Sequence, residues 1–232
     1  MNKEISILIP TINEEKNILK IIKLIKQTLK KITNKYEIIF IDDSSTDDTV
    51  KNISLLKKKN KHIILINSSK RLGLGNALTL GINKAKGKYI LFLDCDCPVG
   101  TIQLRKIIKL RTENSIVIGS RYLKNSRVLG FGKTKILLSK ILNNIISYLY
   151  KIPAKDITHS LRIFCNNLKF TSRVLTHPGY FLEMSVFFKR EKKIFIEVPI
   201  IYKKRKYGKT KNNLTRLLAS TINFFIKMHI KK

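Results

Sequence analysis

Residues 91–100 read LFLDCDCPVG, an apolar run that ends in two aspartates interleaved with two cysteines. A short apolar run of this kind is typical of a buried strand, whose carboxyl end then carries the polar residues. Carboxylates at Asp94 and Asp96 suit a hard cation such as Mg²⁺ or Mn²⁺, whereas thiolates at Cys95 and Cys97 suit zinc. Zinc usually takes four ligands, but the third cysteine lies far away and no histidine is near. The sequence therefore predicts a metal site at Asp94 and Asp96, with the cysteines as small buried side chains.

Strands and helices alternate on both sides of this segment. The predicted strands cover residues 5–9, 36–41, 62–66, 89–93 and 116–118, and the predicted helices cover 17–32, a segment after 45–46, 76–84 and 101–110. This alternation predicts an α/β fold, with a Rossmann-like, mostly parallel sheet and flanking helices. No internal repeat or Pro/Gly-rich linker divides the chain, so we expect a single domain over residues 1–232.

Polar clusters follow four of the predicted strands, at 10–14 (PTINE), 42–45 (DDSS), 94–96 (DCD) and 119–122 (GSRY). Ligands of parallel sheets bind at the carboxyl ends of the strands, so we expect these clusters to form one rim. Two alternatives remain open: Thr11 and Glu14 have the spacing of a helix capping box, and Asp42 and Asp43 are common turn residues. The glycine-rich stretch 71–75 lacks the lysine spacing of a P-loop.

Charge and cysteine content limit which cellular compartment and which binding partners we expect for the protein. The chain has 47 basic and 15 acidic residues, a formal charge of +32 that suits nucleic acid, an acidic membrane or a phosphorylated substrate. A general bias toward Lys, Ile and Asn is the alternative explanation. Lysines are spread through every predicted helix without an RNA-binding signature, so we exclude nucleic acid as a partner. Three cysteines without a disulfide framework, and no signal peptide, indicate a cytoplasmic protein.

Two apolar segments, 134–150 and 214–230, have the pattern of amphipathic helices with basic residues at their edges. Neither is long and uncharged enough to span a bilayer. We interpret both as candidate membrane-surface helices, the first with Lys133, Lys135, Lys140 and Lys151 placed for anionic headgroups. Packing in the protein core is the alternative for each.

The motifs together resemble a known family. PTINEEKNI, IDDSSTDDT, RLGLGNALTLGINKAKGKYILFLDCD and GSRY closely resemble glycosyltransferase family 2, whose fold is named glycosyltransferase-A. DITHSLRIF, GYFLEM and IEVPIIYKKRKYGKTK are similar to the dolichol-phosphate mannose synthase branch. The resemblance runs from about residue 5 to residue 211.

The resemblance implies a role for each matching residue. It places the nucleotide against Pro10, Ile12, Glu14, Ile41, Asp43 and the backbone of Cys95. It places the metal and the diphosphate at Asp94 and Asp96, and further phosphate contacts at Arg121, Arg205 and Lys211. Asp156 and Arg162 would shape the sugar and acceptor side, so that the predicted catalytic residues are Asp96, Arg121, Asp156 and Arg162. The chain departs from the family pattern at Ile12, Ser44, Pro98 and His159.

The implied reaction is inverting transfer of mannose from GDP-mannose to a dolichyl or other polyprenyl monophosphate, with Mg²⁺ or Mn²⁺. The enzyme would work peripherally on the cytoplasmic face of a membrane, where relatives often recruit membrane subunits. A phosphate acceptor is already largely ionised at pH 7, so the reaction needs no dedicated general base. The alternatives are transfer of glucose from UDP-glucose, another family 2 sugar transfer, and a catalytically inactive membrane-bound partner.

Overall fold

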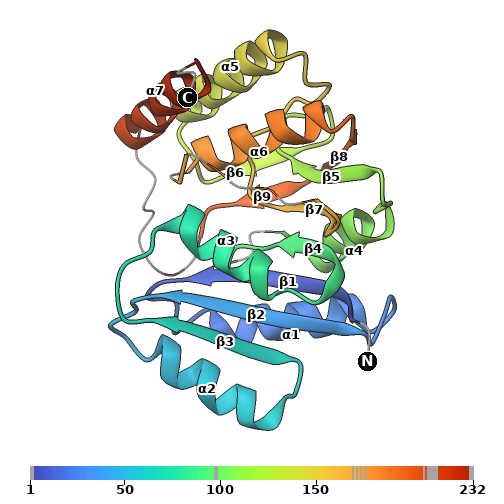
Figure 1. Cartoon of the computed structure of the whole chain (residues 1–232), viewed down its shortest axis with the longest axis vertical. Helices are drawn as coiled ribbons and strands as arrows, with labels where there is room; N and C mark the ends of the chain where they lie inside the picture. The colour runs from blue at the N-terminus through green and yellow to red at the C-terminus, as the bar shows by residue number, and fades with distance from the viewer. Residues whose placement is uncertain are drawn as a thin grey trace.

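The computed structural model describes residues 3–96, 99–168, 170, 172, 174–175, 177–205, 207 and 214–229, with the backbone alone at 214–218 and 229. Within these residues, seven strands form one sheet in the order β3-β2-β1-β4-β7-β5-β8 (Figure 1). The strands of this sheet are β1 (Lys3–Thr11), β2 (Tyr36–Asp43), β3 (Ile63–Ser68), β4 (Gly87–Phe92), β5 (Ser115–Ser120), β7 (Arg162–Cys165) and β8 (Ile194–Pro199). A second small sheet pairs β6 (Arg127–Leu129) with β9 (Ile201–Lys203).

Helices cover both faces of the large sheet. They are α1 (Ile18–Leu29), α2 (Thr49–Lys59), α3 (Leu74–Lys84), α4 (Thr101–Lys109), α5 (Lys133–Leu149), α6 (Gly179–Arg190) and α7 (Leu214–His229). The predicted strands and helices of the first half are all present, with ends that differ by a few residues. The prediction of a mostly parallel sheet is confirmed, because every pair in it is parallel except the two made by β7.

β7 is the element that the strand–helix alternation did not predict. It lies between β4 and β5 and runs antiparallel to both, with Arg162 beside Phe92 on one side and Ile118 on the other. Only four residues long, it begins with an arginine and has no clear strand pattern. Its position matters for the site, because the loop that precedes it must run along the carboxyl ends of β4 and β5.

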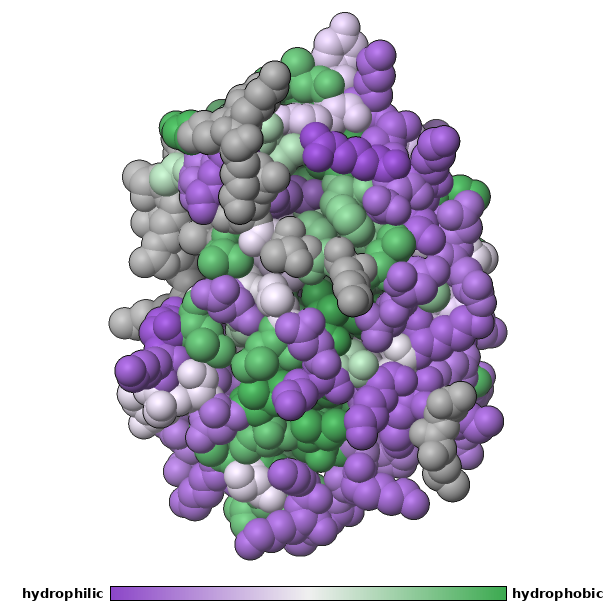
Figure 2. Space-filling view, in the orientation of Figure 1, coloured by the Kyte–Doolittle hydropathy of each residue, from purple (hydrophilic) through white to green (hydrophobic). Residues whose placement is uncertain are grey.

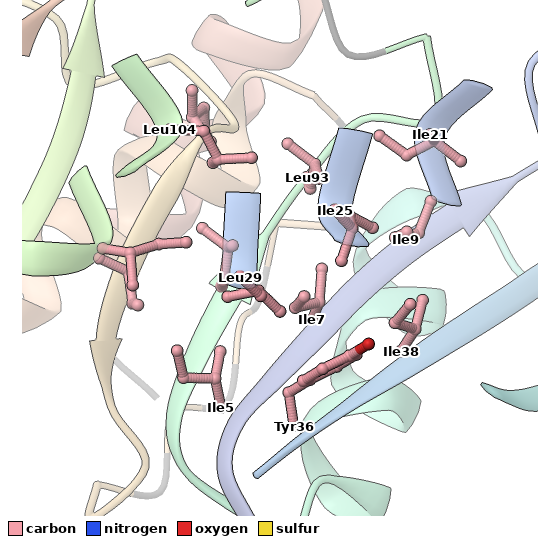
Figure 3. Close-up of a cluster of buried hydrophobic side chains, with 14 of the residues drawn as sticks. Ile5, Ile7, Ile9, Ile21, Ile25, Leu29, Tyr36, Ile38, Leu93 and Leu104 are labelled. Carbon is pink, nitrogen blue, oxygen red and sulfur yellow. The ribbon is translucent and has the colours of Figure 1, made fainter. Parts of the chain in front are cut away.

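The apolar spacing of α1 explains one face of the core. Its isoleucines and leucine recur at helical intervals, so they all point toward the sheet. In Figure 3, Ile21, Ile25 and Leu29 lie against side chains of β1, and all are almost completely buried. Burying such a side chain stabilises the fold by about 1.5–3 kcal/mol. α4 packs beside α1 on the same face.

α3 and α6 cover the opposite face, where close backbone contact explains one glycine. A Cβ on Gly75 would lie 2.5 Å from the Cα of Leu175, so a side chain there would force the backbone apart. Figure 2 shows hydrophilic residues over most of this side of the molecule and hydrophobic ones gathered over the β2–β3 end of the sheet.

α5 and α7 lie beyond α6, at the top of Figure 1. A third core cluster joins them to it: Ile146 of α5, Leu182 and Val186 of α6, and Phe224 of α7. Across the described residues, no helix combines the length and the apolar content that crossing a bilayer requires.

Candidate active site

The ends of β1 and β2 are locked together by hydrogen bonds. Asp42 accepts from the Thr11 hydroxyl (3.1 Å) and from the backbone N–H of Ser45 (2.9 Å). Because the Thr11 hydroxyl is directed at β2, it forms no capping box with Glu14, and that alternative is wrong. The backbone N–H of Glu14 donates to Thr49 Oγ1 (2.8 Å), which leaves the Glu14 carboxylate facing the rim. The expectation that Asp42 works as a turn residue is confirmed.

Asp43 holds the glycine-rich loop before α3. One carboxylate oxygen accepts the backbone N–H groups of Leu72 and Gly73, and the other pairs with the Arg71 Nε at 3.0 Å. Gly73 has φ +77°, a conformation that side chains disfavour, so a glycine suits the turn. Asp43 therefore keeps this loop against the end of β2, beside the predicted nucleotide side.

The predicted nucleotide contacts fall into two groups. Pro10 and Ile12 are partly exposed at the end of β1. The side chain of Ile41 instead is fully buried, and a Cβ on Gly81 of α3 would meet its Cδ1 at 3.0 Å. Ile41 thus belongs to the core, and its side chain does not line an open pocket.

The two aspartates after β4, Asp94 and Asp96, lie near the guanidinium group of Arg205. Asp94 Oδ2 accepts a hydrogen bond from the Ser160 hydroxyl at 2.6 Å. Asp96 Oδ2 accepts from Arg205 Nε at 2.9 Å, while Arg205 Nη2 donates to Glu14 Oε1 at 3.1 Å. Residues far apart in the sequence, Glu14, Asp96 and Arg205, therefore meet at one point of the rim.

Electrostatics identify this point as a place for positive charge. Burial, together with the neighbouring charge of Asp96, raises the pKa of Asp94 from 3.8 to about 6. A carboxylate that is costly to ionise is stabilised by a nearby cation, and oxygen ligands are those that Mg²⁺ and Mn²⁺ take. Among the described side chains, no three Asp, Glu, His or Cys residues gather as a complete metal cage. The aspartates fit a cation that also takes oxygens from a diphosphate and water.

The Cys95 thiol is placed as a core side chain rather than as a metal ligand. Cys95 is 4% exposed and packs in the core, and burial raises the pKa of its thiol well above the usual value. A buried protonated thiol is a poor ligand and nucleophile. The prediction that Cys95 is a buried filler is confirmed; Cys97 and Pro98 lie outside the described residues.

A buried ion pair forms the other half of the rim. Arg121 donates from Nε to Asp156 Oδ2 (2.8 Å) and from Nη2 to Asp156 Oδ1 (2.7 Å), a forked arrangement. Its Nη2 also donates to Thr158 Oγ1 at 3.0 Å. Burial alone would raise the pKa of Asp156, but the charge and hydrogen bonds of Arg121 hold it below 3.8. Both residues are therefore charged at neutral pH.

Arg162 supports the loop between these two halves. Its guanidinium is fully buried and donates to the carbonyl oxygens of Ile157 (3.0 Å) and His159 (3.1 Å) and to the Ser185 hydroxyl (3.2 Å). Burial lowers the pKa of Arg162 to about 9. Sequence reasoning made it a catalytic residue, whereas these contacts give it the geometry of a positioning residue.

Comparisons with known proteins identify the family of the chain. A family model described as glycosyl transferase family 2 matches residues 6–173. The chain belongs to glycosyltransferase family 2. The match takes in the strand-end clusters, the aspartates after β4 and the loop 156–160.

Similar proteins include two that are named as undecaprenyl-phosphate sugar transferases. Over 218 residues, the chain is 24% identical to the undecaprenyl-phosphate 4-deoxy-4-formamido-L-arabinose transferase of Proteus mirabilis (strain HI4320). It is 25% identical to the protein of the same name from Photorhabdus laumondii. The alignments cover 93% of this chain but only 64% and 65% of those relatives, so the chain spans just under two thirds of their length.

Solved structures establish the glycosyltransferase-A fold. Glucosyl-3-phosphoglycerate synthase from Mycobacterium tuberculosis, in complex with Mn²⁺, UDP and phosphoglyceric acid, matches with a TM-score of 0.66 and 16% identity, over 99% of this chain and 80% of that one. A mannosyltransferase from Pyrobaculum calidifontis, in complex with GDP-Man and Mn²⁺, matches with a TM-score of 0.67 and 17% identity, over 100% and 66%. The fold predicted from the sequence is confirmed.

Three polar contacts of this family 2 site were not predicted from the sequence. Ser160 bonds Asp94, Thr158 bonds Arg121, and Tyr202 of β9 stacks edge-on against His159 with ring centres 5.1 Å apart. Serine and threonine are common in loops, so their spacing gives no signal of a partner. Lys211, a predicted phosphate contact, lies outside the described residues.

Proposed function

We propose that the chain transfers a sugar from a nucleotide diphosphate sugar to a polyprenyl monophosphate at a membrane surface, with inversion at the anomeric carbon. One observation supports this most: the carboxylates after β4 and Arg121, which donates to the loop 156–160, lie on one rim, beside a helix with an exposed apolar face. A nucleotide diphosphate needs the carboxylates that would hold its metal, a phosphate acceptor needs a cation, and a lipid tail needs an apolar surface.

The donor side is built from Asp94, Asp96 and Arg205. The two aspartates would hold Mg²⁺ or Mn²⁺, which neutralises charge that builds on the departing diphosphate. Arg205 lies within reach of the same charge and suits phosphate oxygens, because its donors form a planar fork. We propose GDP-mannose as the donor from the sequence motifs, with a UDP-sugar as the alternative, since the relatives are named for a different sugar.

The acceptor side carries two arginines, Arg121 and Arg162, and the Arg121 guanidinium is paired with Asp156. Burial, and then the charge of Arg121, lowers the pKa of both His159 and His177 to about 3, so both rings are neutral. Such a region attracts a phosphate dianion and contributes no general base.

The chemistry then needs no proton transfer. An oxygen of the acceptor phosphate attacks the anomeric carbon, and a new carbon–oxygen bond forms. The bond from that carbon to the diphosphate breaks on the opposite face, and its electron pair leaves with the nucleoside diphosphate. The cations of the rim stabilise the charge that moves between the two phosphates.

α5 supplies the surface for a lipid-linked acceptor. Its apolar side chains are exposed: Leu137 58%, Ile141 45%, Ile145 50% and Leu149 57%. These exposed fractions favour a surface contact over the alternative, which assigned Ile136 and these four residues to the core; Ile136 is partly buried. Lys133 and Lys140 of α5 are exposed as well, and each lysine near an anionic bilayer contributes about 1 kcal/mol to binding. We propose that this face lies on the lipid headgroups. The buried free thiols Cys95 and Cys165 favour the cytoplasmic side, which is reducing.

A panel of nucleotide sugars tested with a polyprenyl phosphate checks the reaction. We expect metal-dependent transfer from one donor, with GDP-mannose tested first, and no transfer to an acceptor that lacks the phosphate. Hydrolysis of every donor without transfer to any lipid phosphate would refute the proposed acceptor.

The membrane contact is tested with Ile141→Asp combined with Ile145→Asp. We expect loss of salt-sensitive binding to anionic vesicles and loss of transfer to a long-chain acceptor, with a smaller effect on a short, water-soluble one. Leu19→Asp combined with Ile102→Asp is the matched control, since these exposed apolar residues lie on α1 and α4 (66% and 78% exposed). Equal loss of vesicle binding in both double variants would argue against α5 as the contact.

A further inference from the structure

One buried polar residue on α5 has no place in the proposed reaction. Of the 17 residues of α5, Asn143 and Ile146 are the two whose side chains are buried, and both are 0% exposed. An asparagine in a helix that is otherwise largely apolar or exposed is costly to bury unless its amide is fully hydrogen-bonded. The partners of Asn143 therefore indicate what it does.

All four hydrogen-bonding positions of the Asn143 amide are used. Its Nδ2 donates to the carbonyl oxygen of Ser139 (2.7 Å) and to Thr158 Oγ1 (3.0 Å). Its Oδ1 accepts the backbone N–H groups of Ile157 (2.8 Å) and Thr158 (3.1 Å). Three of the four bonds join α5 to the loop 156–160, and two of those three fix its backbone.

That loop touches both halves of the rim. Thr158 Oγ1, which Asn143 orients, also accepts from Arg121, and Asp156 forms the ion pair with Arg121. Two residues further on, Ser160 donates to Asp94. A shift of the loop backbone would therefore move a partner of the acceptor-side arginine and a partner of the metal-side aspartate together.

Ile146 is the one fully buried apolar side chain of α5, and it packs in the third core cluster beside the partly buried Leu142. Tyr122 donates to the Ser139 hydroxyl (2.6 Å), and Ser147 donates to the carbonyl oxygen of Ala154 (2.7 Å). Elements with few buried apolar contacts open at low free-energy cost, and a surface contact can shift their equilibrium. A contact that fixes the position of α5 therefore also affects the backbone of the loop 156–160, because the hydrogen bonds of the Asn143 amide join the two.

We propose that Asn143 is a positioning residue that couples the seating of α5 on a lipid surface to the arrangement of the loop 156–160. The inference deepens the proposed function, because it makes the order of the acceptor-side loop depend on the membrane contact of α5. No group is transferred in this step; the membrane stabilises one arrangement of residues that already bond one another.

Amide hydrogen exchange tests the coupling without any substrate. In the wild-type chain, anionic vesicles should slow exchange at the Ile157 and Thr158 amides, since seating α5 holds their acceptor in place. In Asn143→Leu these amides should exchange about tenfold faster, which corresponds to the loss of one buried hydrogen bond, and vesicles should no longer slow them. Asn144→Leu is the matched control, because Asn144 is the adjacent, exposed asparagine of α5.

Vesicle binding and kinetics separate positioning from general damage. Asn143→Leu should bind vesicles and donor nucleotide within about twofold of wild type, while kcat/KM for the long-chain acceptor falls about tenfold or more. Unchanged exchange at Ile157 and Thr158 when vesicles bind the wild-type chain would overturn the proposal, even if the variant fails to fold. Equal behaviour of Asn143→Leu and Asn144→Leu would overturn it too. Failure of transfer in every wild-type assay would refute the proposed function and leave the exchange result standing.

Discussion

Replacing Arg205 with alanine should make metal binding tighter in the absence of nucleotide. In the structure the Arg205 guanidinium bridges Asp96 (2.9 Å) and Glu14 (3.1 Å), so it already supplies positive charge where a divalent cation would bind. A metal ion that uses Asp96 must first take its carboxylate from Arg205. The arginine is therefore an internal competitor for the metal and, once a diphosphate has bound, a partner for its oxygens.

The magnitude follows from the bond that must break. A hydrogen bond to a charged group contributes about 1.5–3 kcal/mol, and 1.4 kcal/mol is tenfold in an equilibrium constant. Freeing Asp96 from Arg205 thus costs about tenfold to a hundredfold in metal affinity. Arg205→Ala should recover most of this factor, while turnover falls because the leaving diphosphate loses a cation.

Titration of Mn²⁺ by calorimetry or electron paramagnetic resonance measures the effect, first without and then with the nucleoside diphosphate. Lys203→Ala is the control, because it removes an exposed positive charge from the neighbouring strand β9 and touches neither carboxylate. Tightening should be seen in Arg205→Ala alone, and only without nucleotide. Unchanged Mn²⁺ affinity, or equal tightening in Lys203→Ala, would refute the competition.

The other predictions concern single groups of the site. Asp96→Asn should lower transfer by at least about a hundredfold with an unchanged melting temperature, measured by product formation and calorimetry; near-normal metal-dependent activity would contradict the metal assignment. The double variant Cys95→Ala, Cys97→Ala should keep metal-dependent transfer. Stoichiometric zinc in the wild-type chain that is lost in the double variant would contradict this prediction. Asp156→Asn should cost about 3–5 kcal/mol of unfolding free energy, because it leaves the buried Arg121 unpaired; Asp48→Asn, at an exposed pair, should cost about 0–1 kcal/mol. The buried neutral ring of His159 contributes to the free energy of unfolding above pH 6.5. This contribution is lost as the pH falls toward its folded pKa of about 3, because the unfolded chain binds a proton that the folded chain does not. His159→Asn should flatten that loss in urea unfolding between pH 7 and about pH 5, and an unchanged slope would argue against the buried neutral ring.

The sequence predicted what depends on local pattern. Alternating apolar runs and helical spacing were enough to find β1–β5 and α1–α5, and the polar residues after them indicated the rim. Asp94 and Asp96 could be chosen over the thiols from ligand chemistry alone. What failed was the burial of single side chains, as with Ile41, which lies on the same face of β2 as Asp43 but is completely buried against α3.

Contacts between distant segments could not be predicted for a physical reason. From the sequence, Asn143 is only an interruption of an apolar helix, because its partners outside α5, Ile157 and Thr158, are placed by the antiparallel return of the chain into β7. Arg162 is a second case: the family resemblance placed it on the sugar and acceptor side, yet its position in β7 buries it below the loop 156–160. Such roles depend on which distant segments the folded sheet brings together, and the local sequence pattern does not contain that information.

The central position of β7 has a consequence for how the chain folds during synthesis. β4 ends 70 residues and β5 ends 42 residues before β7 begins, yet the two strands flank β7 in the sheet and cannot pair with each other in the native order. Both must keep an unpaired edge until residues 162–165 arrive, and exposed strand edges invite pairing with other chains. We expect nascent chains arrested between α5 and β7 to need chaperone protection, and the rim to form late, since the residues just before β7 and then Arg205 after β9 complete it.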